Sequence, residues 1–89
     1  MEIVWTEYMK YRMRLRGFDP VSVEHILRRS VERYMDSATG RRIAIGRDNQ
    51  RLVMIAYEQE TTILTPVTIH VASRQQINIR VKSGRFRNE

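Results

Sequence analysis

Two side chains that can carry a proton, Glu58 and His70, lie near the ends of apolar, strand-like runs that also contain arginine. Arg47 closes one such run at residues 41–47, and Arg74 follows His70 at the end of another. Metal-free cleavage of RNA needs a base for the ribose 2′-hydroxyl, cations for the phosphorane and an acid for the leaving 5′ oxygen. These residue types supply all three groups, so the candidate catalytic residues are Arg47, Glu58, His70 and Arg74.

Both proton carriers also have an ordinary structural explanation. His70 lies in an apolar, alternating strand, which suits a half-buried, hydrogen-bonded histidine equally well. Glu58 closes a strand and would form an ion pair with Arg47 or Arg51. No metal or other cofactor is expected, because His25 and His70 are far apart in the sequence and no carboxylate pattern accompanies them.

Most of the positive charge of the chain is arginine. Sixteen Lys and Arg against ten Asp and Glu give a net charge of +6, and only Lys10 and Lys82 are lysines. Arginine presents a planar fork of donors that matches phosphate oxygens in pairs. The excess is greatest after residue 73, which favours binding of nucleic acid or of an acidic protein there. The predicted nucleic-acid-binding residues are Arg42, Arg80, Lys82 and Arg85.

Length and composition limit the class of protein. The 89 residues predict one domain, residues 1–89. No apolar stretch reaches membrane-spanning length, and the N-terminus lacks the features of a signal peptide. The absence of cysteine excludes a disulfide scaffold, a thiolate nucleophile and a cysteine-ligated zinc site. A cytoplasmic protein without a membrane partner fits these features.

Two helices are predicted near the N-terminus, after a short strand at residues 3–5. Thr6 is expected to cap the first helix and Gly17 to end it, and Asp19 with Pro20 would begin the second. Apolar side chains recur at helical spacing in both. The expected buried positions are Tyr8, Tyr11, Leu15 and Phe18 in the first helix, and Val23, Ile26 and Leu27 in the second.

Strand patterns dominate the rest of the chain. Alternating apolar residues predict an antiparallel meander followed by one more strand, entered through Pro66. The expected strands are 31–37, 41–47, 51–58 and 67–72, with a polar loop at 59–65. Ser73 and Gln76 fit a capping box, whereas the alternation after them fits a strand. We favour a short helix over residues 73–82.

Four segments resemble a known family when they are taken in order. They are Phe18–Val21, Arg42–Arg47, Arg51–Tyr57 and Ile69–Arg74. Their arrangement resembles the small RelE-like toxins of bacterial toxin–antitoxin systems, and most closely the BrnT branch and its uncharacterised sister families. The resemblance implies an α+β fold in which an N-terminal strand and helix hairpin pack on a small antiparallel sheet, with a basic C-terminal segment.

The resemblance also implies a function. It implies a metal-independent endoribonuclease in the cytoplasm, with RNA as substrate and a cognate antitoxin that covers the basic surface. BrnT-like chains usually carry an arginine-rich helix where this chain has the neutral segment 75–79, and His70 is not typical of them, so their catalytic set is not transferred. The alternatives are a non-catalytic RNA- or protein-binding module on the same fold, and a homo-oligomer that docks through Ile77, Ile79 and Val81.

Overall fold

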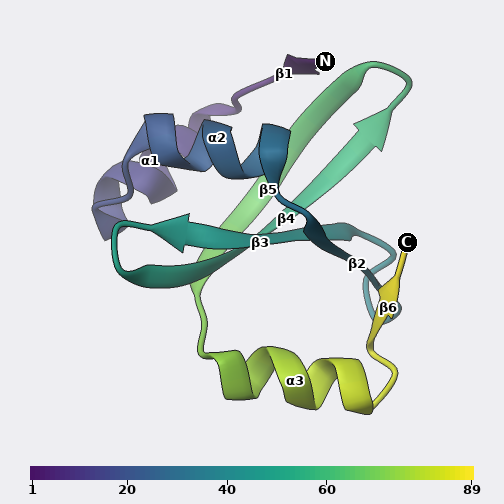
Figure 1. Ribbon diagram of the computed structural model, residues 1–89. Coiled ribbons are helices and arrows are strands. Elements are labelled where there is room, and N and C mark those ends of the chain that lie inside the picture. Colours follow the sequence, from purple (N-terminus) through teal and green to yellow (C-terminus); the bar gives the residue numbers. More distant parts are fainter.

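A single six-stranded sheet carries helices on both of its faces (Figure 1). The computed structural model describes all residues, 1–89. Helices α1 (Glu7–Arg16) and α2 (Pro20–Arg29) cover one face, the hairpin face, and α3 (Arg74–Lys82) covers the other, the α3 face. The strands are β1 (Glu2–Ile3), β2 (Glu32–Asp36), β3 (Arg42–Asp48), β4 (Arg51–Glu60), β5 (Ile63–Val71) and β6 (Phe86–Asn88). The predicted α+β class is confirmed, and no helix has the length and apolar character needed to cross a membrane.

The strands follow the order β1-β5-β4-β3-β2-β6. All neighbours are antiparallel except β1, which pairs with β5 in parallel through two residues only, Glu2 and Ile3. The predicted meander β2–β3–β4 is confirmed. Strand β6 was not predicted, because three residues with two polar side chains give no readable alternation. It pairs with β2 and returns the C-terminal segment to the sheet.

The polar loop predicted at residues 59–65 is wrong. Strand β4 continues to Glu60 and β5 begins at Ile63, so a tight turn at Thr61 and Thr62 joins them. Thr61 takes a positive φ of 55° to close that turn. Pro66 therefore lies inside β5, at the register shift between Ala56 and Tyr57, where its missing N–H is tolerated.

Capping residues set the helices where the sequence predicts them. The Thr6 hydroxyl accepts from the Met9 N–H at 3.1 Å, and Gly17 ends α1 in the left-handed conformation. Asp19 caps α2, with Pro20 in its first turn. Helix α3 is also confirmed, because Ser73 and Gln76 form both hydrogen bonds of a capping box, at 3.0 and 3.1 Å.

The predicted buried stripe of α1 is wrong in its rotation. Met9 and Met13 are buried, whereas Tyr8, Tyr11 and Leu15 are each more than half exposed. The helix carries large apolar residues on two sides, so its spacing fits two stripes. The flexible methionine side chains fill the space between the helices and the sheet, which favours the observed one.

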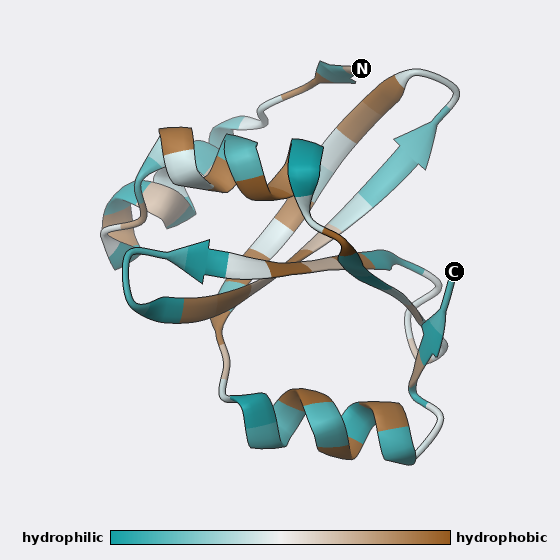
Figure 2. Ribbon diagram, in the orientation of Figure 1, coloured by the Kyte–Doolittle hydropathy of each residue, from teal (hydrophilic) through white to brown (hydrophobic).

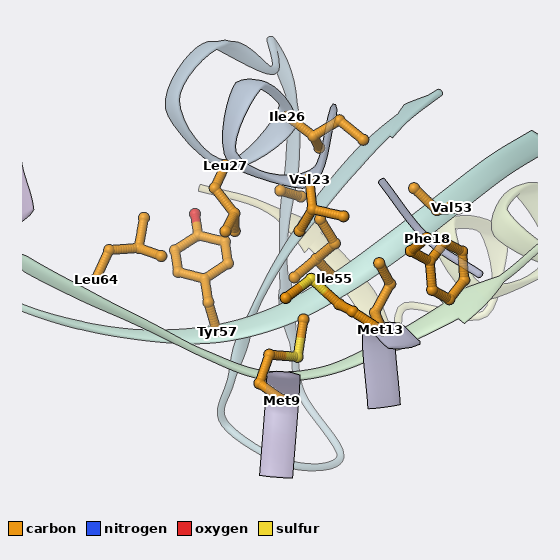
Figure 3. Close-up of a cluster of buried hydrophobic side chains, with 12 residues drawn as sticks. Met9, Met13, Phe18, Val23, Ile26, Leu27, Val53, Ile55, Tyr57 and Leu64 are labelled. Atoms are coloured by element: carbon orange, nitrogen blue, oxygen red, sulfur yellow. The ribbon is translucent and has the colours of Figure 1, made fainter. Parts of the chain in front are cut away.

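Side chains alternate across the sheet and build two separate cores. The larger core lies on the hairpin face and joins residues such as Met9, Leu27 and Ile55 (Figure 3). The smaller core lies on the α3 face, and its buried members are Ile43, Ile45, Leu52, Ala72, Ile77 and Phe86. Brown apolar turns alternate with teal polar ones along α3, consistent with one buried side (Figure 2). The expected apolar strip of α3 is divided, since Ile77 is buried and Ile79 is exposed.

Gly46→Ala is expected to lower the free energy of unfolding by about 1–3 kcal/mol. An ideal Cβ at Gly46 would lie 2.6 Å from Ile26 Cγ1 and 2.8 Å from Ile26 Cγ2, so α2 must move away from β3. Urea denaturation measures this change. In an Ile26→Ala background the same substitution should cost less, because the clashing carbons are gone. An unchanged free energy of unfolding for Gly46→Ala alone would contradict the close approach.

Candidate functional site

A cleft of about 210 Å³ lies on the α3 face, bounded by α3, β6 and the strands of the sheet. Strand alternation and the end of α3 bring basic and polar side chains to its walls. They are Asp36, Thr39, Arg41, Thr68, His70, Arg80 and Arg85, over apolar Ile43, Met54, Ala56 and Phe86. We call this hollow the arginine cleft. It gathers three of the predicted site residues: His70, Arg80 and Arg85.

Two of the arginines in the cleft have no carboxylate partner. Arg41 Nε is buried and forms no hydrogen bond. Arg80 donates only to the Met54 sulfur, at 3.2 Å, and its guanidinium carbon lies 5.5 Å from the centroid of the Phe86 ring. Neither arginine forms a salt bridge. Two uncompensated cations at the walls of one cleft attract an anion such as a phosphate.

Sequence reasoning missed Arg41 and selected its neighbour Arg42. Strand alternation gives the two residues opposite directions. Arg42 lies across from Tyr57, a member of the hairpin-face core, and pairs with Glu89 at 3.0 Å. Arg41 precedes Ile43 by two residues and shares the α3 face with it. The alternation was the signal that could have found Arg41.

The only carboxylate in the cleft is already engaged. Asp36 accepts from Arg85 Nε and Nη2, at 3.1 and 3.2 Å, and from the Ala38 N–H at 2.9 Å. Burial acts to raise the pKa of Asp36, but these hydrogen bonds outweigh it and hold the pKa below its ordinary value. Asp36 is therefore ionised and neutralises Arg85. Arg85 organises the wall of the cleft, while Arg41 and Arg80 supply its free charge.

His70 is held in one orientation by α1. Arg12 Nη2 lies 3.1 Å from His70 Nδ1, and a guanidinium can only donate, so we assign the ring proton to Nε2, 3.4 Å from Thr68 Oγ1. Burial lowers the pKa of His70, and the charges of Arg12, Arg16 and Arg80 lower it further. The imidazole is thus neutral at pH 7 and can take up a proton.

Arg74 lies outside the arginine cleft and is fully paired. Its two Nη atoms donate to the carboxylate of Glu32 at 2.6 and 3.0 Å, and the Tyr34 hydroxyl donates to the same carboxylate at 2.7 Å. The hydrogen bond from Arg74 lowers the pKa of Glu32 and, in return, the pKa of Arg74 is raised. Arg74 therefore fastens the start of α3 to β2.

The remaining predicted site residues are also outside the cleft. Glu58 is exposed in β4 opposite Thr65, and with Glu60 it lines a hollow at the turn between β4 and β5. Its expected ion pair with Arg47 or Arg51 is wrong, because Arg51 pairs with Asp48 at the other end of the strand. Arg47 donates to the Gln50 carbonyl at 3.3 Å. Lys82 is exposed at the end of α3.

Two larger hollows lie on the hairpin side, with volumes of about 490 and 430 Å³. The first is the mainly apolar groove between α1 and α2. In the second, Arg33 donates to the Leu27 and Ser30 carbonyls and to the Tyr57 hydroxyl, so it completes the end of α2. Neither hollow brings a free guanidinium beside a titratable group, as the arginine cleft does. No three His, Asp or Glu side chains gather into a group that could hold a metal ion.

Comparisons with protein-family models, with curated proteins and with solved structures find no match for this chain. The resemblance to RelE-like and BrnT-like toxins therefore remains a hypothesis.

Proposed function

We propose that this protein is a cytoplasmic endoribonuclease toxin of the RelE/BrnT type, which cleaves RNA in the arginine cleft without a metal ion. A cognate antitoxin with an acidic surface would inhibit it by covering the cleft. One observation carries the proposal: neutral His70 shares a cleft with Arg41 and Arg80, whose charges no carboxylate compensates. This combination joins a proton acceptor to two phosphate ligands.

The proposed reaction is attack of the ribose 2′-hydroxyl on the adjacent phosphate. His70 takes the hydroxyl proton, and its lowered pKa keeps it in the accepting form near neutral pH. Arg41 and Arg80 stabilise the charge that develops on the phosphorane oxygens. The imidazolium that forms can return its proton to the departing 5′ oxygen. The products are a 2′,3′-cyclic phosphate and a free 5′-hydroxyl.

The purified protein is expected to cleave RNA in the presence of EDTA and to leave 2′,3′-cyclic phosphate ends. Because the pKa of His70 is lowered, the rate should fall with decreasing pH only below 6.5, the ordinary value for histidine. His70→Gln should lower the rate by roughly 10²–10⁴-fold and remove this acid limb. The pH–rate profiles of the two proteins measure both effects.

His25→Gln is the matched control, because His25 lies on α2, outside the arginine cleft. Its profile should equal that of the wild type. Loss of all cleavage in EDTA, or a His70→Gln variant that keeps the full rate, would contradict the proposed chemistry. Expression of the wild type in bacteria should arrest growth, and expression of His70→Gln should not.

A second candidate is an RNA-binding module that does not cleave. It is favoured by the absence of a free carboxylate in the cleft, since Asp36 is bound to Arg85, and by the partners on both ring nitrogens of His70. Salt-sensitive RNA binding that leaves the RNA intact, with and without ribosomes, would select this alternative.

A further inference from the structure

Arg12 is anchored by neutral groups only. Its Nε donates to the Ile69 carbonyl at 3.1 Å, its Nη1 to the Tyr8 hydroxyl at 3.3 Å, and its Nη2 to His70 Nδ1 at 3.1 Å. No carboxylate pairs with it. The guanidinium is therefore held in place with its charge uncompensated. Three of its five N–H groups are used, so two remain for a ligand.

The position of Arg12 extends the arginine cleft around the edge of the sheet. The outer edge of β5 is paired with β1 only at Ile63 and Leu64, so Ile69 faces α1 instead of another strand. Arg12 passes from α1 to this edge and reaches His70 on the α3 face. A polyanion that leaves the cleft past His70 meets this cation next.

An exposed aromatic ring lies beside the same guanidinium. Tyr8 precedes Arg12 by one helical turn, is 56% exposed, and touches Arg12 through its hydroxyl. An exposed tyrosine whose hydroxyl is already bonded presents the face of its ring to solvent. Aromatic faces next to cations bind single-stranded nucleic acid, because any base can stack on the ring while the cation binds the phosphate.

We propose that Arg12 and Tyr8 form a nucleotide subsite for single-stranded RNA, adjacent to the arginine cleft; this rests on the proposed RNA substrate. Arg12 binds the phosphate next to the one in the cleft, and the base of that nucleotide stacks on Tyr8. The subsite accepts any base, because stacking does not read its hydrogen-bonding edge. Double-stranded RNA is excluded, since its bases are not free to stack.

The test measures the dissociation constant of a short, uncleavable single-stranded RNA with a 2′-O-methyl backbone, by fluorescence anisotropy at fixed salt. Tyr8→Leu removes the ring and should weaken binding roughly 5- to 30-fold. Tyr8→Phe keeps the ring and should remain within about threefold of the wild type. Tyr11→Leu is the matched control, because Tyr11 is equally exposed on the same helix but forms no bond with Arg12.

Abasic RNA makes the test specific for stacking. Removing one base at a time should identify a position that weakens binding to the wild type as much as Tyr8→Leu does. The Tyr8→Leu variant should lose nothing more at that position, because the partner ring is already absent. Equal losses from the abasic change in both proteins would overturn the stacking contact.

The subsite and the proposed function fail in different ways. If Tyr8→Leu binds RNA as the wild type does, while loss of Arg41 and Arg80 abolishes binding, the subsite is wrong and the cleft stands. If loss of Arg41 and Arg80 also has no effect, RNA does not use the cleft and both ideas are wrong. Circular dichroism of each variant checks that the fold is retained.

Discussion

The double variant Arg41→Gln/Arg80→Gln is expected to cleave RNA at least about 100-fold more slowly than the wild type, with its fold intact. Both guanidiniums reach the arginine cleft, and neither is paired with a carboxylate. Their removal therefore breaks no ion pair. The only listed contacts that are lost are those of Arg80 with Met54 and Phe86, so the free energy of unfolding should change by about 1 kcal/mol or less.

RNA binding gives a second measurement on the same variant. Each lost phosphate contact lowers the dependence of log K on log salt, so the slope should become shallower by roughly 1–2 for the two arginines. Arg14→Gln/Arg29→Gln is the matched control, because it removes the same charge from α1 and α2, where both residues line hollows outside the cleft. If the control loses as much affinity and rate as the cleft variant, net charge alone explains the binding.

Ile77→Ala is expected to lower the free energy of unfolding by about 2–5 kcal/mol, a large share of the stability of a domain this small. Ile77 is the one fully buried side chain of α3, with 0% of its surface exposed, and it packs against the core of the α3 face. Shortening it removes the main apolar contact between the helix and the sheet. Denaturation in urea measures the loss.

Ile79→Ala is a control of the same chemical type on the same helix. Ile79 is 58% exposed, so its truncation should change the free energy of unfolding by no more than about 0.5 kcal/mol. Equal effects of the two substitutions would mean that α3 is not docked as described. Because α3 contributes Arg80 to the arginine cleft, Ile77→Ala should also weaken RNA binding under conditions where the rest of the fold persists.

Short-range chemistry explains why much of the fold could be predicted from the sequence. A cap depends on residues within one turn, so Thr6, Gly17, Asp19 and Ser73 mark the ends of helices correctly. The choice of helix for residues 73–82 followed from the capping box. The alternating apolar residues there gave the opposite indication, and the local hydrogen bonds decided between them.

Features that depend on distant segments could not be predicted in this way. The rotation of α1 depends on which side chains the sheet accepts, and Met9 was chosen over Tyr8. The pairing of β6 with β2 joins residues about fifty positions apart, without a local signal. The site suffered for the same reason. Arg74 was selected for its place beside the His70 strand, but its charge is neutralised by Glu32, which is remote in sequence.

The hairpin of β4 and β5 extends beyond the helices and carries exposed Glu58 and Glu60 near its turn (Figure 1). The arginine cleft lies elsewhere on the same sheet, so the molecule has an acidic end and a basic region and therefore an electric dipole. A polyanion is repelled by the first and attracted by the second. The carboxylate of Glu58, which takes no part in the cleft, thereby orients an approaching nucleic acid over a distance of about one Debye length, roughly 8 Å at physiological salt.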